Sequence, residues 1–489
     1  MLGASLVALL TGSVFACSRK LATERELSVR SFATDTPSRV PIVSVRSSNR
    51  SSDAPAAFLV HGYQCNKSMM LQLAKYLALN GIDSYAIDLP GHGASPEPHV
   101  DERAPLVAAE ALEYLVRHEG LRKDRTVLVG HSYGAMVLGR VVVADPSYAA
   151  VVFLGPGFTS GFTPSVPNAL FVVTAEHDYD FVVRASRSIM ADATGGALAA
   201  PGIWLGGTGR ARLWRIVPGL GHVGLILSQP VFREVLNWIE TSTGFVARPE
   251  RTPATRESIA LVLLVPAALA GTALFWRSPA PTQATGPMLR PFLILGCAWF
   301  TALLGLRHFV PLRFMHLREG EILASLIFIA GALAAILDGA LCRGAHLPRL
   351  RSALRGIPAA LGAVALLYLC AALLIERDFY HVAISPVRGA VAMIIALAVY
   401  PFFAFCEGLF PPRGAGRAMA VGLVYGVAAL SLCVLRCRME RFGPALFVLG
   451  TACAAAGPIL VRIAKDRAAA PALSALTAGW ILAVGFMRY

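Results

Sequence analysis

The chain shows two different patterns of hydrophobic and polar positions. From Ala56 to about Gly244, short apolar and β-branched runs alternate with longer stretches of helical spacing. The runs that predict strands are 56–60, 83–89, 126–130, 150–155, 169–175 and 212–217. Short apolar strands separated by helices are typical of a mainly parallel sheet with helical crossovers. About 190 residues can bury their own core, so the pattern predicts one α/β domain over 53–245.

A second pattern begins after Arg256, where long runs carry few charges or none. There are eight such runs, approximately 258–276, 288–306, 321–341, 356–375, 386–409, 418–435, 443–463 and 468–487. At a rise of about 1.5 Å per residue, each run can cross a hydrocarbon core of about 30 Å. The sequence therefore predicts a linker over 246–257 and an all-α transmembrane bundle of about eight helices over 258–489.

The amino terminus begins with a third kind of segment. Residues 1–16 are almost wholly apolar and lead to Cys17, a stretch that is short for a membrane span. Segment 1–17 is predicted to be a signal or an N-terminal membrane anchor, and Val14-Phe15-Ala16-Cys17 leaves open either cleavage or lipidation of Cys17. Residues 18–52 are rich in Ser, Arg and Thr, and we expect them to form a tether.

Composition and charge support a membrane protein and argue against a nucleic-acid partner. Apolar residues make up 55% of the chain and charged residues 15%. Lys and Arg outnumber Asp and Glu by 24 to 22 up to residue 257, but by 20 to 8 after it. These basic residues form small clusters between uncharged runs, as loops at a bilayer surface do. The nine cysteines form no evident disulfide framework, and without CxxC or HExxH spacing we expect no metal and no organic cofactor.

The strongest chemical signal is the segment Gly130-His131-Ser132-Tyr133-Gly134. It follows the predicted strand 126–130 and precedes a helical stretch, which is the context that a G-x-S-x-G nucleophile turn requires. A strand that turns sharply into a helix brings backbones close together, so small residues are needed two positions before and after the serine. The pattern predicts Ser132 as a nucleophile.

A serine hydroxyl needs a histidine base and a carboxylate that orients this base. His222 follows the predicted strand 212–217, and Asp178 follows the strand 169–175. Both lie on loops at the carboxyl ends of strands, where open α/β sheets place their sites. We expect His222 to be the base and Asp178 its partner, with Asp180 and Glu176 as rival carboxylates.

Acyl transfer also needs two backbone N–H groups that face the developing oxyanion. Val60-His61-Gly62-Tyr63 ends the first predicted strand, and Tyr133 follows the nucleophile. The amides of Tyr63 and Tyr133 are therefore the expected oxyanion hole. The side chain of His61 is expected to be structural.

The segments HGYQCN, DLPGHGAS, GHSYGA, AEHDYD and GLGH resemble the α/β-hydrolase superfamily in order and spacing, over about residues 53–243. The resemblance is to its lysophospholipase, monoacylglycerol lipase and serine aminopeptidase group. It implies hydrolysis of an ester, thioester or amide through an acyl-enzyme, and it implies a structural turn at Asp88 and His92. It does not extend to the apolar half.

One departure from the resemblance bears on the substrate. Many relatives carry a helical lid after the strand that corresponds to 150–155, whereas only 156–168 separates this strand from the next. An open site near a bilayer favours a lipid or lipid-linked ester. The alternatives are a peptidase or thioesterase on the same triad, or a transporter or receptor with a ligand-binding hydrolase-like domain. A cleaved signal would export this domain, and we favour the extracytoplasmic side; an uncleaved segment followed by Arg19 and Lys20 would keep it cytoplasmic.

Overall fold

The computed structural model divides the chain into two compact units, one formed mainly by 12–263 and the other by 264–371 and 382–488. The structure describes 2–48, 51, 53–196, 200–206, 210–247, 250–261, 289–308, 318–342, 357–365, 368–369, 386–409 and 469–485. Each unit is treated separately below.

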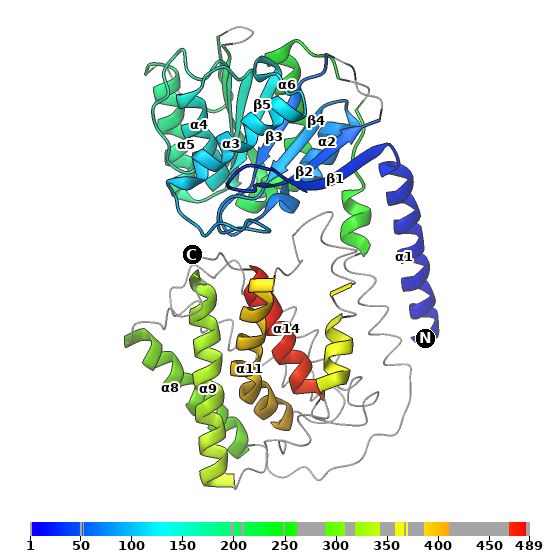
Figure 1. The fold of residues 1–489 in the computed structure, drawn as a ribbon, viewed down its shortest axis with the longest axis vertical. Coiled ribbons are helices and arrows are strands. Elements are labelled where there is room, and N and C mark those ends of the chain that lie inside the picture. Colours follow the sequence, from blue (N-terminus) through cyan, green and yellow to red (C-terminus); the bar gives the residue numbers. More distant parts are fainter. Residues whose placement is uncertain are drawn as a thin grey trace. The chain divides into compact units, whose positions relative to one another are not determined.

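The amino-terminal unit contains a nine-stranded sheet within its described residues (Figure 1). The strands are β1 (Leu27–Ala33), β2 (Pro41–Ser47), β3 (Ala56–Val60), β4 (Asp83–Ile87), β5 (Thr126–His131), β6 (Ala150–Leu154), β7 (Leu170–His177), β8 (Trp204–Leu205) and β9 (Arg212–Gly221). Their order is β1-β2-β4-β3-β5-β6-β7-β9-β8. The six strands from β4 to β9 in this order are parallel, whereas β1, β2 and β8 pair antiparallel with their neighbours. The predicted α/β fold with a mainly parallel sheet is confirmed.

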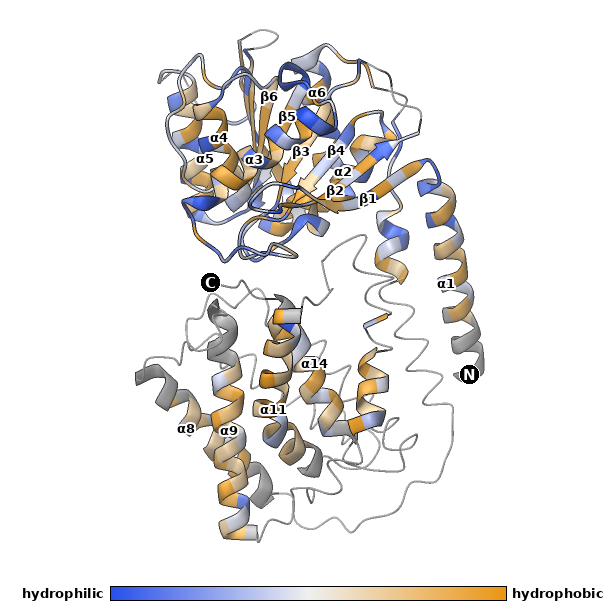
Figure 2. Cartoon of the chain, viewed as in Figure 1, coloured by the Kyte–Doolittle hydropathy of each residue, from blue (hydrophilic) through white to orange (hydrophobic). Residues whose placement is uncertain are grey.

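Helices cover both faces of this sheet and enclose a core on each. The helices are α2 (Leu71–Leu79), α3 (Arg103–His118), α4 (Tyr133–Ala144), α5 (Asp180–Ala193) and α6 (Gln229–Thr243), with short 3₁₀ turns η1 (Lys67–Met70), η2 (Lys123–Arg125) and η3 (His222–Ile226). On β5, Val127 and Val129 pack toward α2 and α6, while Leu128 packs toward α3, α4 and α5. Successive strand residues point to opposite faces, so both faces of the central strands are apolar (Figure 2).

The predicted tether over 18–52 is wrong for most of its length. Residues Leu27–Ala33 and Pro41–Ser47 form β1 and β2, and β2 pairs with β4 and is almost entirely buried. Ser44 and Ser47 are buried beside Val43 and Val45. These polar residues interrupt the apolar run, so the sequence pattern does not indicate a buried strand here. Pairing with β4 satisfies the backbone of β2, which local composition could not reveal.

Residues before β1 form the helix α1 (Leu2–Glu24), which continues across the predicted cleavage point at Cys17. Near its end, Glu24 accepts a 2.9 Å hydrogen bond from Nζ of Lys75 in α2. Arg19 forms an exposed ion pair with Glu257 at 3.1 Å. Cleavage, anchoring and lipidation of this segment stay predictions.

The carboxyl-terminal unit is helical where it is described. Its named helices are α8 (Leu289–His308), α9 (Arg318–Cys342), α11 (Pro386–Leu409) and α14 (Ala469–Gly485), which coincide with four predicted spans. Within the described ranges, two helices are long and apolar enough to cross a membrane, at Ala324–Leu341 and Val387–Cys406. The spans predicted over 418–435 and 443–463 lie outside the described residues, as do most of 258–276 and much of 356–375.

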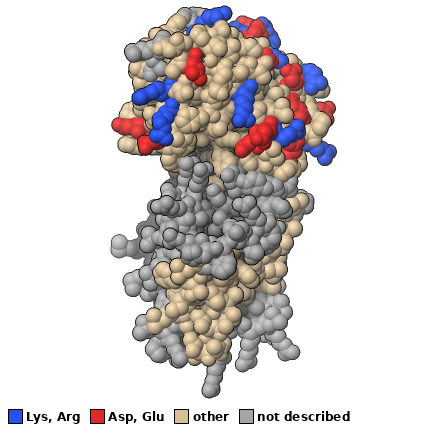
Figure 3. All heavy atoms as spheres, turned by 90° about the vertical axis from the view of Figure 1, so that its left-hand side faces the viewer, with Lys and Arg blue, Asp and Glu red and all other residues tan. Residues whose placement is uncertain are grey.

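Glycines allow the described apolar helices to approach closely. A Cβ on Gly331 of α9 would lie 2.6 Å from the backbone N of Phe402 in α11. A Cβ on Gly479 of α14 would lie 2.2 Å from the carbonyl O of Ala392 in α11. Small residues at helix contacts are typical of packing between apolar helices. On the face in Figure 3, charged side chains gather on the amino-terminal unit, while the visible described atoms of the other unit are almost all uncharged.

Candidate active site

The candidate nucleophile Ser132 lies between β5 and α4 in a strained backbone conformation. Its φ of 53° and ψ of −112° are unfavourable for a residue with a Cβ. Its N–H donates to the carbonyl O of Leu154 at 2.9 Å, which fixes the turn against β6. A Cβ on Gly134 would lie 2.3 Å from the carbonyl O of Val60, and one on Gly130 would lie 2.6 Å from Cα of Ala135. Both motif glycines are therefore required by close backbone contacts.

The structure brings His222 and Asp178 together at the same edge of the sheet. Nδ1 of His222 lies 2.7 Å from Oδ1 of Asp178, whose side chain is fully buried. The carboxylate also accepts the N–H of Tyr179 at 2.9 Å and the N–H of Ala175 at 3.2 Å. With the carboxylate as acceptor, Nδ1 of His222 carries the proton and Nε2 is left to accept one.

The rival carboxylates occupy other places. Asp180 is exposed at the first position of α5. Glu176 is half exposed and accepts the N–H of Gly219 at 2.7 Å, so it fixes the end of β9. Of the three carboxylates, it is Asp178 that contacts the His222 imidazole.

Gly155, at the end of β6, lies among all three candidate residues. It follows Leu154, which holds the N–H of Ser132. A Cβ on Gly155 would lie 2.9 Å from Nδ1 of His222 and 3.3 Å from Oδ2 of Asp178, and its φ is +59°. Within the described part of the chain, which includes both residues, the Ser132 hydroxyl makes no hydrogen bond with His222. Hydrogen bonds of this kind often form only when substrate is bound.

The expected oxyanion amides lie beside the nucleophile. Tyr133 is the first residue of α4, so its N–H has no acceptor within the helix and lies at the positive end of the helix dipole. A Cβ on Gly62 would lie 3.2 Å from Cβ of Ser132, which places the following residue, Tyr63, next to the nucleophile. The rings of Tyr63 and Tyr133 are 5.9 Å apart.

Two further residues hold this arrangement, and the sequence analysis missed them. The Tyr133 hydroxyl donates to Oδ1 of Asp101 at 2.8 Å, and Nε2 of His99 lies 3.2 Å from the same oxygen. Asp101 and His99 lie in the loop before α3, about thirty residues from the motif. Burial, with a smaller contribution from Asp101, raises the pKa of Tyr133, so its hydroxyl stays a donor. No local sequence signal marks such a contact.

His131 is a third residue that sequence reasoning missed. It is buried, its ring lies 4.8 Å from the His222 ring, and its Nε2 lies 3.3 Å from the His222 carbonyl O. Burial, followed by the nearby His222, lowers the pKa of His131 to about 3. The ring is therefore neutral, and its Nε2–H holds the backbone of His222 in place.

The residues expected to be structural form the turn beneath the site. Nε2 of buried His61 accepts the N–H of Leu89 at 3.2 Å. The buried carboxylate of Asp88 accepts the N–H and the ammonium of Lys67, at 2.7 and 2.5 Å. Burial lowers the pKa of His61 and of His92, so both rings are neutral at pH 7. This network keeps the loops around the nucleophile in a fixed position.

The segment between β6 and β7 is short and, over 155–169, contains no helix. Within this segment, Thr163 and Val166 form an isolated β-bridge. A helical lid at this position is therefore absent, as the sequence predicts.

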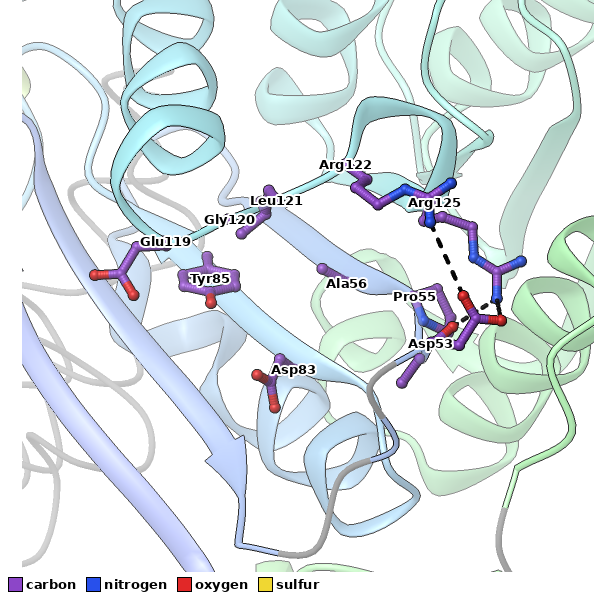
Figure 4. Close-up of a pocket in the computed structure, with 11 residues that line it drawn as sticks. Asp53, Pro55, Ala56, Asp83, Tyr85, Glu119, Gly120, Leu121, Arg122 and Arg125 are labelled. Atoms are coloured by element: carbon purple, nitrogen blue, oxygen red, sulfur yellow. Dashed lines mark hydrogen bonds and ion pairs between the residues drawn. The ribbon is translucent and has the colours of Figure 1, made fainter.

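A polar pocket lies at the opposite edge of the sheet, where β3, β4 and β5 begin (Figure 4). Its charged groups have partners: Asp53 pairs with Arg125 at 3.0 Å inside the pocket, and Glu119 pairs with Arg46 of β2 outside its lining. Because parallel strands place their carboxyl ends at one edge, this pocket is separate from the site at Ser132. Among the residues that the structure covers, no cluster of His, Cys, Asp or Glu could hold a metal ion.

Comparison with known proteins agrees with this geometry. Residues 53–184 match the family described as serine aminopeptidase, S33, a little over a quarter of the chain. The chain is 27% identical over 100 residues to monoacylglycerol lipase abhd6-B of Xenopus laevis, and 26% identical over 98 residues to monoacylglycerol lipase ABHD6 of Rattus norvegicus. Each alignment covers 20% of this chain and 29% of the relative, so the chain spans under a third of these relatives.

Among solved structures, the α/β hydrolase GrgF from Penicillium sp. sh18 is 14% identical, with a TM-score of 0.34 over 45% of this chain and 99% of that one. The family match, the strand order and the strained serine turn agree with one another. Together they support an α/β-hydrolase domain within this chain.

Proposed function

We propose that the protein is a membrane serine hydrolase that cleaves a lipid or lipid-linked ester through an acyl-enzyme. The observation that carries this proposal is the 2.7 Å contact between Nδ1 of His222 and the buried Asp178, at the edge of the sheet where Ser132 occupies a strained turn. A domain that only bound ligand would need neither the strain nor a buried carboxylate on the histidine. This is why a transporter or receptor role is the weaker hypothesis.

In the proposed mechanism, Ser132 is the nucleophile and His222 the general base. Oγ of Ser132 bonds to the carbonyl carbon of the substrate while its proton passes to Nε2 of His222. The oxygen that becomes negative accepts hydrogen bonds from the amides of Tyr63 and Tyr133. The carbon–oxygen bond to the alcohol then breaks, and His222 returns the proton to the leaving oxygen. Water repeats these steps on the acyl-enzyme and frees the acid.

Asp178 orients His222 and stabilises the imidazolium that forms during each step. Its two backbone donors, Ala175 and Tyr179, hold the carboxylate in place, so the imidazole cannot rotate without losing a buried hydrogen bond. His131 fixes the main chain of the same histidine from the other side. No metal or organic cofactor has a part in this chemistry.

Three features support a lipid-like substrate. Both relatives are monoacylglycerol lipases by name. The segment 155–169 carries no helical lid that would enclose a small metabolite. Two described helices can cross a membrane, and we propose that they belong to a bundle of about eight, with the hydrolase domain on the extracytoplasmic side.

A peptidase is the second candidate, because the matching family is described as a serine aminopeptidase. The same triad can attack an amide or a thioester. Competing ester, thioester and aminoacyl probes at equal concentration would separate these activities, and faster turnover of the aminoacyl probe would favour the peptidase.

Labelling of the purified full chain with a fluorophosphonate probe tests the nucleophile. We expect rapid labelling of wild type, none of Ser132→Ala, and slow labelling of Asp178→Asn. Asp180→Asn is the matched control, because this exposed carboxylate lies two residues away and does not contact His222; it should label as wild type does. Equal labelling of wild type and Ser132→Ala would refute the proposed function.

A further inference from the structure

An apolar surface lies directly beside His222, and the mechanism above makes no use of it. It consists of Tyr179, Phe181 and Val223, which are 38%, 41% and 41% exposed; we call it the His222 rim. The Tyr179 ring meets the His222 ring edge to face, with centroids 5.3 Å apart. The Phe181 ring stacks on Tyr179 at 5.7 Å and 14°. Val223 follows His222 in the chain.

The backbone of the candidate site holds this rim in place. Tyr179 is the residue before α5, and its N–H donates to the carboxylate of Asp178. Its carbonyl O accepts the N–H of Val182 at 2.8 Å, which begins the helix that carries Phe181. The next side chain, Val182, is buried in the core. The hydrogen bond to Asp178 fixes the backbone of Tyr179 and therefore the start of α5. With α5 in this position, Val182 is buried while the rings of Tyr179 and Phe181 stay exposed.

The chemistry of ester cleavage decides which part of a substrate this rim meets. His222 has to protonate the leaving oxygen when the carbon–oxygen bond breaks, so this oxygen must come within hydrogen-bond distance of Nε2. The oxyanion points instead to the amides of Tyr63 and Tyr133, and the acyl chain takes the remaining direction from the tetrahedral carbon. A group attached to the leaving oxygen therefore lies beside the imidazole and its neighbours.

We propose that the His222 rim binds the alcohol part of the substrate, and that this alcohol carries a hydrocarbon chain. This inference rests on the proposed function. Two aromatic rings and a valine offer apolar contact and a single hydroxyl, which suits an alkyl alcohol or the hydrocarbon-bearing backbone of a lipid. A glycerol leaving group, as in a monoacylglycerol, would leave this surface without an apolar partner. The substrate class is thus an ester whose leaving group is itself lipid-like.

Two isomeric esters test this assignment directly. Decyl acetate carries its long chain on the alcohol and ethyl decanoate carries it on the acyl group, while both have the same molecular formula. We expect kcat/KM for decyl acetate to exceed that for ethyl decanoate by about tenfold in the purified full chain. Each buried methylene is worth about fourfold, and this difference corresponds to roughly two methylenes on a half-exposed surface.

Variants of Phe181 separate the rim from the intrinsic reactivity of the two esters. Phe181→Ser should lower the decyl acetate to ethyl decanoate ratio at least threefold, and Phe181→Leu should keep most of it. Val29→Ser is the matched control, because Val29 is an exposed apolar residue on β1, six strands from β7 in the sheet. It should leave the ratio unchanged.

The outcomes keep this inference distinct from the proposed function. If Phe181→Ser leaves the ratio unchanged, or if wild type prefers ethyl decanoate and loses that preference in this variant, the rim does not bind the alcohol. Fluorophosphonate labelling of Ser132 would continue in either case, because Phe181 is not part of the catalytic machinery. Loss of labelling in wild type would instead refute the hydrolase itself.

Discussion

Replacing Ser132 by glycine tests the strained turn without any substrate. The φ of 53° and ψ of −112° suit glycine, whereas a residue with a Cβ in such a region costs about 1–3 kcal/mol. Glycine also makes the unfolded chain more flexible, which lowers the free energy of unfolding by about 0.4–1 kcal/mol relative to alanine. The balance is a stabilisation of roughly 1.3 kcal/mol for Ser132→Gly over Ser132→Ala.

For a unit of this size, 1 kcal/mol corresponds to about 2–4 °C in Tm. We therefore expect Ser132→Gly to melt about 3–5 °C above Ser132→Ala when intrinsic fluorescence of the purified chain is followed during heating. Both variants lack the hydroxyl, so the comparison isolates the backbone strain. Equal melting temperatures, or a higher value for Ser132→Ala, would refute the proposed strain at the nucleophile.

Three further predictions follow from the surroundings of the site. Asp178→Asn should lower kcat about 10⁴-fold, because an amide beside Nδ1 favours the wrong tautomer of His222; turnover within tenfold of wild type would exclude Asp178 as the orienting residue. The pKa of His131, which burial lowers to about 3, lies below its unfolded value of about 6.5, so the unfolded state binds more protons between these values and stability falls as pH drops through that range. His131→Gln should flatten the fall of Tm from pH 7 to pH 5, and parallel curves for both proteins would contradict this. Lys67→Met leaves the buried Asp88 without its ammonium partner, which costs about 3–5 kcal/mol, and calorimetry should find Tm lower by about 10 °C; an unchanged Tm would mean that the pair stabilises nothing.

The strands of the parallel sheet could be predicted because each is buried on both faces. A strand such as β6, Ala150–Leu154, has no polar residue, and helices on either side leave no position for one. The same logic located Asp178 and His222, since parallel strands bring their following loops to one edge. Sequence separation of about ninety residues between Ser132 and His222 is irrelevant once both follow parallel strands.

The first two strands could not be predicted, for a related reason. β1 is an edge strand with most of its residues exposed, and its sequence LSVRSFA lacks a run of apolar residues. β2 is buried, but Ser44, Arg46 and Ser47 interrupt its pattern. Arg46 instead donates a 2.7 Å hydrogen bond to the Tyr85 hydroxyl in β4. A partner distant in sequence thus makes a polar residue acceptable in the sheet, and local composition cannot indicate this.

Contacts between residues from separate segments could not be predicted from the sequence either. Asp101 meets Tyr133, and His131 meets the carbonyl O of His222, only because the turn after β5 faces the loops after β4 and β9. Neither pair has a fixed spacing or a characteristic motif. The sequence therefore nominates the candidate groups Ser132, His222 and Asp178, but it does not indicate the residues that contact them.

Gly155 is a residue whose importance the sequence does not indicate and the structure reveals. A Cβ added at Gly155 would meet both His222 and Asp178, and its φ of +59° favours glycine independently of the space available. A side chain there would have to displace the imidazole or the carboxylate, and the Leu154 carbonyl that fixes Ser132 would move with it. The end of β6 thus couples the position of Ser132 to that of His222, although it contributes no side chain to the candidate site. A backbone constraint of this kind explains how main-chain hydrogen bonds can position Ser132, His222 and Asp178 from three separate loops.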